Sequence, residues 1–217
     1  MKKIALDGPA GSGKSTVAKR IANKLCIEYL DTGAMYRAVT LYFMRQQISF
    51  ENQQAVEEAL SHIQIDFNEG QLYLNQENVT EEIREPQVAS QVSKVAAIKA
   101  VRTAMVKQQQ AMATRKDIIM DGRDIGTVVL PDTPYKFFLT ASIDARAIRR
   151  YEEMLSKGFT VSLEQIKEDI SKRDSLDMSR TESPLIQAED AILVDTTNLN
   201  IEDVVELLLV HIDRISE

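Results

Sequence analysis

The first fifteen residues hold the feature that most constrains this fold, a glycine-rich loop between an apolar run and a helical pattern. The loop, residues 8–15, reads Gly-Pro-Ala-Gly-Ser-Gly-Lys-Ser and matches the phosphate-binding consensus G-x-x-x-x-G-K-[ST]. Residues 4–6 before it suit a buried strand, and apolar residues after it recur at helical spacing from Val17 to Leu25. The sequence therefore predicts a strand, a phosphate loop and a helix in that order.

The chemistry of this loop follows from its residue types. Glycines let the chain turn so that successive backbone N–H groups point at phosphate oxygens, and the positive end of the following helix adds to the attraction. The dinucleotide fingerprint G-x-G-x-x-G fits less well, because Thr16 stands where its third glycine belongs. Lys14 is expected to reach the β- and γ-phosphates, and the Ser15 hydroxyl to hold Mg²⁺. We expect a nucleoside triphosphate to contact Gly8, Pro9, Ala10, Gly11, Ser12, Gly13, Lys14, Ser15 and Thr16.

Charge and cysteine content limit the partners of this chain. Its 217 residues carry a net charge of −7, which argues against nucleic-acid binding because that requires a basic surface. No apolar run approaches membrane-spanning length, so we expect no membrane partner. The single cysteine, Cys26, cannot form an internal disulfide, and we expect it to pack on the apolar side of the first helix. The sequence predicts a monomer in a reducing cytoplasm.

A second strand and helix are predicted after the first helix. Residues 27–31 read as a short strand, and a helical pattern runs from Thr32 through about Gln47, with Thr32 as its cap. Arg37 lies about one turn further on, near enough to share a site with Thr32. A solvated helix face is the simpler interpretation of Arg37 taken alone.

The hydrophobic pattern changes period after a polar helix at about 52–60. Residues 63–67 alternate, Glu69-Gly70 signals a turn and residues 72–74 follow, which together predict a β-hairpin. Because the chain otherwise alternates strand and helix, we interpret about 60–86 as an inserted subdomain. Helical periodicity then returns at Val88 and continues past Met105, and Arg102 within it is by default a solvated side chain.

A second informative stretch covers residues 117–126. Its short apolar run ends in Asp121 and looks like a buried parallel strand that delivers a carboxylate to the carboxyl edge of the sheet, where ligands bind in open α/β folds. Asp121 is thus a candidate for the outer coordination of Mg²⁺. Arg123 and Asp124 leave the strand beside it, and a plain Asp-Gly turn with a local Arg–Asp pair is the alternative.

Two predicted helices carry arginines that suit phosphate chemistry. The helix at 145–157 holds Arg146, Arg149 and Arg150 without matching acids among them. In a phosphate-transfer enzyme such residues neutralise the charge that spreads over the transition state, and the alternative is a basic solvated face.

The next predicted helix starts near Ser162, with Gln165 completing a capping box. It carries Arg173, Asp177 and Arg180 at i, i+4 and i+7, which share one face if the helix continues. Such a row is either a salt-bridge ladder or a site for an anionic second substrate. A last strand at 191–195 and a final helix that begins after residue 200 complete the pattern.

Three classes of phosphate-loop protein compete. A GTP switch needs a guanine-reading N-K-x-D motif, but Asn23-Lys24 is followed by Leu25 and Cys26 and lies in the first helix. An ATPase motor or assembly protein usually brings a longer chain and a further module. The small size and the arginines favour a small-molecule kinase, which needs a second pocket lined by arginine.

Four segments carry a resemblance to the bacterial cytidylate kinases, a branch of the nucleoside monophosphate kinases. They are residues 4–15, 30–37 (Leu-Asp-Thr-Gly-Ala-Met-Tyr-Arg), 121–129 (Asp-Gly-Arg-Asp-Ile-Gly-Thr-Val-Val) and 172–180, and the resemblance runs nearly end to end. We expect an α/β fold, a P-loop NTPase-type parallel sheet flanked by helices, with a small inserted β-hairpin subdomain and a short helical lid at about 146–160. The chain would be a single kinase domain, 1–217, with its core at about 1–50 and 87–217.

The resemblance implies that the γ-phosphate of ATP is transferred to CMP or dCMP, with Mg²⁺ on Ser15 and with Asp121 acting through water. Charge stabilisation of the transferred group would come from Lys14, Arg123, Arg146, Arg150 and Arg180. Two alternatives stay open, a sister kinase acting on another monophosphate such as UMP and a non-catalytic nucleotide-binding regulator. The remaining implied contacts are Thr32, Arg102, Arg123 and Asp124 to cytosine and its phosphate, Arg37 and Arg180 to the phosphate, Arg173 and Asp177 to the sugar hydroxyls, and Arg146 and Arg150 in the lid.

Overall fold

The structure is a computed structural model that describes residues 1–68, 70–156 and 158–216. The chain divides into two compact units, a sheet unit (Met1–Leu30 and Ala113–Glu217) and a hairpin unit (Asp31–Met112). Glu69 of the predicted turn and Lys157 of the predicted helix and lid lie outside the described residues. None of the described helices is long and apolar enough to cross a membrane.

The sheet unit is built on five strands in the order β2-β6-β1-β7-β8. In this sheet β1 pairs in parallel with both β6 and β7, and β7 pairs in parallel with β8. The chain thus places later strands on both sides of β1, which is the kind of switch point where α/β sheets bind ligands. This arrangement confirms the predicted α/β class. The strands are β1 (Lys3–Asp7), β2 (Glu28–Asp31), β6 (Ile118–Gly122), β7 (Tyr135–Thr140) and β8 (Ile192–Asp195).

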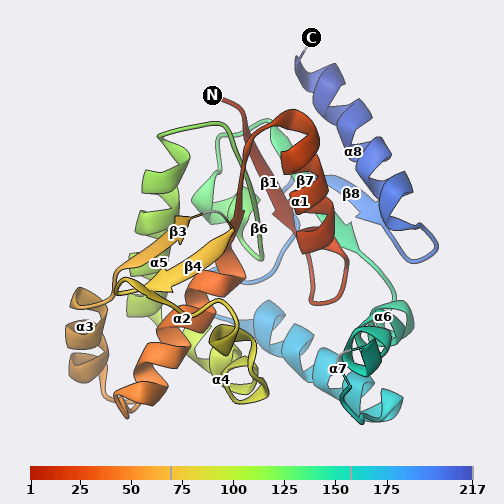
Figure 1. Cartoon of the computed structure of the whole chain (residues 1–217). Coiled ribbons are helices and arrows are strands. Elements are labelled where there is room, and N and C mark those ends of the chain that lie inside the picture. The colour runs from red at the N-terminus through yellow and green to blue at the C-terminus, as the bar shows by residue number, and fades with distance from the viewer. Residues whose placement is uncertain (69, 157, 217) are drawn as a thin grey trace. The chain divides into compact units, whose positions relative to one another are not determined.

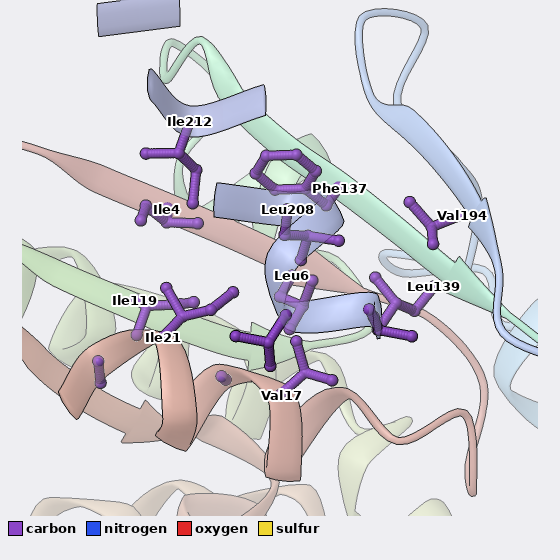
Figure 2. Packing of buried hydrophobic residues seen from close by; sticks show 14 residues of the cluster. Ile4, Leu6, Val17, Ile21, Ile119, Phe137, Leu139, Val194, Leu208 and Ile212 are labelled. Carbon is purple, nitrogen blue, oxygen red and sulfur yellow. The ribbon is translucent and has the colours of Figure 1, made fainter. Parts of the chain in front are cut away.

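Two helices, α1 (Lys14–Leu25) and α8 (Ile201–Ser216), cover one face of this sheet (Figure 1). Figure 2 shows Val17 and Ile21 of α1 and Leu208 of α8 directed at the same strands. These side chains of each helix face the core, and burial of a side chain of this kind supplies about 1.5–3 kcal/mol. This packing fixes the first turn of α1, and with it the phosphate loop, against the end of β1.

The other helices of the sheet unit are α6 (Ile143–Ser156) and α7 (Leu163–Ser179), which pack on each other through Ala147, Ile166 and Ile170. As predicted, Ser162 caps α7 by accepting a hydrogen bond from the Gln165 backbone N–H at 3.4 Å. The Gln165 side chain donates forward to Asp169 through its Nε2 at 3.1 Å.

The hairpin unit contains a three-stranded antiparallel sheet, β3-β4-β5. The predicted hairpin is confirmed as β3 and β4, but β5 is too short for its pattern to be read from the sequence. Asn75 and Gln76 join β4 to β5 with φ angles of 49° and 71°, as a tight two-residue turn requires. The elements are α2 (Thr32–Arg45), α3 (Gln53–Ser61), β3 (Ile65–Asn68), β4 (Gln71–Leu74), β5 (Glu77–Asn78), a 3₁₀ turn η1 (Glu82–Arg84), α4 (Pro86–Ala96) and α5 (Lys99–Ala113).

Three local predictions are wrong. Asp31, not Thr32, caps α2, because its Oδ1 accepts from the Ala34 N–H at 2.9 Å and Thr32 is the first helical residue. The long helix predicted from Val88 onward breaks between α4 and α5, where the N–H groups of residues 97 and 98 bond three residues back and tighten the last turn. Cys26 is exposed, because it sits at the C-cap of α1 in the left-handed conformation with φ 54°.

Candidate active site

Side chains from other parts of the sheet unit hold the phosphate loop by donating hydrogen bonds to its backbone carbonyls. The Ala10 carbonyl accepts from Arg146 Nη1 at 3.0 Å, and the Ser12 carbonyl accepts from Thr196 Oγ1 at 3.1 Å. In a trans peptide the N–H points opposite to the carbonyl of the preceding residue. These two bonds therefore turn the N–H groups of Gly11 and Gly13 to the other side, where a phosphate would lie.

Two glycines of the loop are required by close packing. Gly8 has a φ of 147°, and a Cβ there would overlap the backbone carbonyl oxygen of Leu139 in β7. Gly11 has a φ of 76°, and a Cβ there would lie 3.1 Å from the Cβ of Arg146. Any side chain at these positions would push the loop away from the sheet and from α6.

Ser15 and Asp121, which are 106 positions apart, meet at the start of α1. Ser15 Oγ donates to Asp121 Oδ2 at 2.6 Å, and the Tyr29 hydroxyl donates to Asp121 Oδ1 at 2.7 Å. The buried Asp121 carboxylate thus fixes the Ser15 hydroxyl from the end of β6. The assignment of both residues to Mg²⁺ stays a prediction.

Lys14 is buried, and its Nζ donates to the Pro9 carbonyl at 2.9 Å. Burial lowers the pKa of Lys14 to about 7; Arg123 and Arg173 act in the same direction, and Asp121 and Asp177 act against it. The lysine that should meet the triphosphate is therefore only partly protonated near neutral pH in the absence of phosphate.

A cluster of arginines surrounds Asp177 on the last turn of α7. Arg123 Nε donates to Asp177 Oδ2 at 2.9 Å, and Arg180 Nη1 lies 3.9 Å from Asp177 Oδ1. Burial opposes ionisation of Asp177, but Arg123, Arg173 and Arg180 outweigh it and lower its pKa. The predicted helical row stops short of Arg180, because α7 ends at Ser179, but the Arg180 side chain still turns back to Asp177, which Arg123 also contacts from the end of β6. Three arginines around one carboxylate leave an excess of positive charge, so this group can bind an anion.

Asp124 is buried and begins a short helical turn, η2 (Ile125–Val129), directly after Arg123. Position 124 lies two residues beyond the end of β6, at the same sheet edge as the phosphate loop. The structure therefore brings together Lys14, Ser15, Asp121 and Arg123 of the predicted site, with Arg123 reaching across to Asp177.

Arg146 is buried and fully engaged. Besides its bond to Ala10, its Nε donates to the Ala141 carbonyl at 3.0 Å and its Nη2 lies 2.7 Å from Asp174 Oδ2. Arg146 therefore connects the phosphate loop to α7 through Asp174, the residue that follows Arg173. The sequence predicted a lid arginine at this position, whereas the structure places its guanidinium against the loop.

The other two arginines of α6 have different surroundings. Arg149 donates to the Thr196 hydroxyl at 3.1 Å and to the Thr196 carbonyl at 2.5 Å, so it supports the same residue that holds Ser12. Arg150 is exposed, and its Nη1 donates to Glu153 at 2.7 Å. Of the predicted lid arginines, the structure places only Arg150 on the surface.

The predicted residues of the hairpin unit lie around the start of α2. Thr32 is buried in its first turn, and Arg37 Nη2 bonds Asp31 Oδ2 at 2.8 Å. Arg102 of α5 is buried with Nη1 donating to the Ala96 carbonyl at 3.1 Å, and its guanidinium lies over the Tyr36 ring at 5.2 Å. The solvated interpretation of Arg102 is therefore wrong.

Sequence reasoning missed four supporting residues, Asp7, Tyr29, Asp174 and Thr196. Each acts across the fold on a partner far away in the sequence, so no local pattern marks it. The only local signal was that Asp7 ends a strand and Thr196 follows one, because ligand-binding residues gather at the carboxyl ends of strands.

Among the described residues, no group of three or more His, Cys, Asp or Glu side chains could hold a metal ion. A metal here would thus depend on Ser15, water and ligand phosphates. Mg²⁺ prefers that kind of site, because it keeps several waters and binds through few protein oxygens plus phosphates.

Comparison with known proteins agrees with this geometry. Residues 4–214 match the family described as cytidylate kinase. The cytidylate kinase of Caldanaerobacter subterraneus subsp. tengcongensis is 53% identical over 204 residues, which cover 94% of this chain and 91% of that protein. The cytidylate kinase of Carboxydothermus hydrogenoformans is 50% identical over 216 residues, with 98% and 97% covered.

A solved structure with a similar fold is that of an uncharacterized protein from Eubacterium ventriosum. It has a TM-score of 0.54 and 15% identity, and the match covers 98% of this chain and 99% of that chain. At this identity the likeness concerns the fold alone. The sequence relatives are far closer, and together with the matched residues they show that this chain belongs to the cytidylate kinase family.

Proposed function

We propose that this protein transfers the γ-phosphate of ATP to CMP or dCMP, giving CDP or dCDP and ADP. The observation that carries the proposal is the sheet edge where Lys14, the Ser15–Asp121 pair and the Arg123–Asp177 pair meet. One side of this edge suits a triphosphate, and the other suits an anionic acceptor. Family membership supports cytidine monophosphates as that acceptor.

ATP binding is assigned to the phosphate loop from Gly8 to Thr16. Its N–H groups and the start of α1 attract the phosphates, and Lys14 would hold the β- and γ-phosphates. Ser15 would hold Mg²⁺ directly, and Asp121 would orient a bound water. When bound, Mg²⁺ neutralises charge on the phosphates and aligns them.

Phosphoryl transfer needs alignment and charge neutralisation rather than a covalent nucleophile. The acceptor is already a phosphate oxygen that is anionic near neutral pH, so no general base is assigned. Arg123 and Arg180 would neutralise the transferred group, with Asp177 keeping their guanidinium groups in position. Exclusion of water by a closing lid would suppress ATP hydrolysis.

Selection of the acceptor is assigned to buried polar groups. Asp124 would accept from the exocyclic amino group of cytosine, an interaction that uracil cannot provide and that its O4 oxygen would oppose. Thr32 and Arg102 would bind the base and its phosphate, and Arg37 the phosphate. Arg173 and Asp177 would meet the sugar hydroxyls.

The two arginines predicted for the lid receive different roles. Arg150 is exposed on α6 and would reach the phosphates when the lid closes. Arg146 would hold the loop through Ala10 while bound to Asp174. A cytoplasmic location and a monomeric state stay predictions from the sequence.

The direct test is to identify the product. The protein, Mg²⁺ and ATP labelled in the γ-phosphate are incubated with CMP, with UMP and without acceptor, and the nucleotides are separated by chromatography. Label in CDP with little release as inorganic phosphate supports the proposal. Label mainly in inorganic phosphate would indicate an ATPase, and label in UDP at the higher rate would favour a sister kinase, which the family match does not favour.

A further inference from the structure

Asp7 ends β1 and is only 4% exposed, and its carboxylate binds the backbone of a segment 118 positions away. Its Oδ1 accepts from the Ile125 N–H at 2.8 Å, and its Oδ2 accepts from the Gly126 N–H at 2.7 Å. Burial raises the pKa of Asp7 to about 7, and the N–H groups of Gly126 and Ile125 act in the opposite direction. In its ionised form Asp7 makes charge-assisted bonds to two successive N–H groups, and such bonds are about twice as strong as neutral ones. Asp7 therefore fixes the position of the chain directly after Asp124.

The segment that Asp7 holds is the start of the η2 turn. The N–H groups of Val128 and Val129 donate to the Asp124 carbonyl at 2.9 and 3.2 Å, whereas the first N–H groups of any helical turn lack partners inside it. The side chain before the turn commonly supplies that acceptor. Here Asp124 stands in that place but makes no capping bond with its side chain, and the acceptor comes from Asp7 instead.

Close packing shows how tightly the turn is seated. A Cβ added at Gly126 would lie 3.4 Å from Asp7 Oδ2 and 3.3 Å from Cδ of Lys136. Lys136 is itself fixed, since its Nζ donates to the Pro131 carbonyl at 2.6 Å and lies 2.7 Å from Asp190 Oδ2. The turn thus has little room to move away from β1.

We propose that Asp7 is a positioning residue for acceptor selection: by capping the η2 turn in place of Asp124, it commits the Asp124 carboxylate to the acceptor base rather than to its own backbone. The inference rests on the proposed function, in which Asp124 accepts from the cytosine amino group. Because Gly8 follows Asp7, the same residue also joins the start of the phosphate loop to the acceptor-reading turn.

A carboxylate is needed for this role because two N–H donors face it. An asparagine offers one carbonyl oxygen and two N–H groups, so one backbone donor would meet another donor. In an Asp7→Asn variant one of the two bonds breaks, and the N–H group left without an acceptor competes for the side chain at the N-cap position, which is Asp124. The broken bond should change the preference for CMP over UMP more than it changes the affinity for ATP.

The test compares the wild-type protein with Asp7→Asn by measuring kcat and KM for CMP and UMP and the Kd for ATP. We expect the CMP-over-UMP ratio of kcat/KM to fall by about tenfold, as for the loss of one hydrogen bond to a charged group, with the Kd for ATP changed by less than about threefold. Asp195→Asn is the matched control, because Asp195 also ends a strand and accepts from a backbone N–H, that of Thr197 at 2.9 Å. Its ratio should stay at the wild-type value.

Gly126→Ala approaches the same contact from the other side and leaves Asp7 intact. Its methyl group would touch Asp7 Oδ2 at 3.4 Å and would lie 3.3 Å from Lys136 Cδ, which is closer than most such contacts, so a small shift of the turn relative to Asp7 should lower the ratio even if Asp7→Asn fails to fold. An unchanged CMP-over-UMP ratio in either folded variant, or an equal fall of kcat with both acceptors, would overturn the proposal. A wild-type protein that does not phosphorylate CMP would instead refute the proposed function.

Discussion

Asp121 accepts a hydrogen bond from the Ser15 hydroxyl at 2.6 Å, and this bond positions the loop side chain proposed to hold Mg²⁺. The second oxygen of the carboxylate is occupied by the Tyr29 hydroxyl at 2.7 Å. Both oxygens of the Asp121 carboxylate at the end of β6 are therefore held in place. The hydroxyl that this carboxylate binds belongs to Ser15, in the first turn of α1. The Mg²⁺ dependence proposed for this protein should therefore respond to changes at Asp121.

Asp121→Asn should raise the free Mg²⁺ concentration that gives half-maximal activity by about 10–100-fold, the usual cost of losing a group that orients a metal ligand. The measurement is the rate against free Mg²⁺ at saturating nucleotides, together with Mn²⁺ binding followed by electron paramagnetic resonance. Asp117→Asn is the control, because Asp117 precedes the same strand but is exposed, and its side chain accepts from the Lys2 N–H at 2.8 Å, away from Ser15. An unaltered Mg²⁺ dependence in Asp121→Asn would contradict the assignment.

ATP binding should be coupled to proton uptake at Lys14. Burial lowers the pKa of this ammonium to about 7 in the nucleotide-free protein, and phosphates would raise it. Above pH 7 the lysine must gain a proton to bind, so the Kd for MgATP should rise toward about tenfold per pH unit.

Calorimetry of ATP binding in two buffers with different ionisation enthalpies measures this proton directly. Lys14→Arg provides the comparison, because arginine stays protonated throughout this range. Its Kd should be flatter with pH, and its binding enthalpy should not depend on the buffer. Equal pH slopes for both proteins would rule out Lys14 as the group that takes up the proton.

Arg146→Ala should lower the free energy of unfolding by about 3–5 kcal/mol, because it leaves Asp174 buried without its partner. Urea denaturation measures this change. Asp174→Asn with Arg146→Ala should be less damaging than the sum of the single changes, as expected for two residues in contact. Additive effects would mean that the pair does not interact in solution.

Arg150→Ala should separate catalysis from stability. Its ion pair with Glu153 is exposed, so its loss should change the free energy of unfolding by less than about 1 kcal/mol. If Arg150 reaches the transferred phosphate, kcat should nevertheless fall by about 10²-fold. A variant that keeps the wild-type kcat would show that this arginine belongs only to the surface of α6.

The sequence predicted those parts of the fold that depend on local patterns. The strands before Gly8 and before Arg123 were visible as short apolar runs, and the helix after Lys14 was visible by its spacing. The hairpin was visible because its alternation differed from the rest of the chain. The break between α4 and α5 was invisible, since Val95 and Val101 stay buried on both sides of it and the apolar period continues across.

The candidate site was predictable in its residue types but not in its connections. Motif spacing located Lys14, Ser15 and Asp121, and the arginine row located Asp177. That Asp7 caps a turn after Asp124, or that Thr196 holds Ser12, depends on strand order and register, which no local pattern encodes. Arg102 was misjudged for the same reason, because its burial comes from Tyr36 and Ala96 and not from its own helix.

The most direct test of the central claim is a coupled ADP-release assay with ATP and Mg²⁺ against CMP, dCMP, UMP, AMP, GMP and dTMP in parallel. We predict the highest kcat/KM values for CMP and dCMP, because only cytosine offers an amino donor to Asp124 at that edge of a pyrimidine. Faster turnover of any other monophosphate, or no turnover with all six despite ATP binding, would contradict the account.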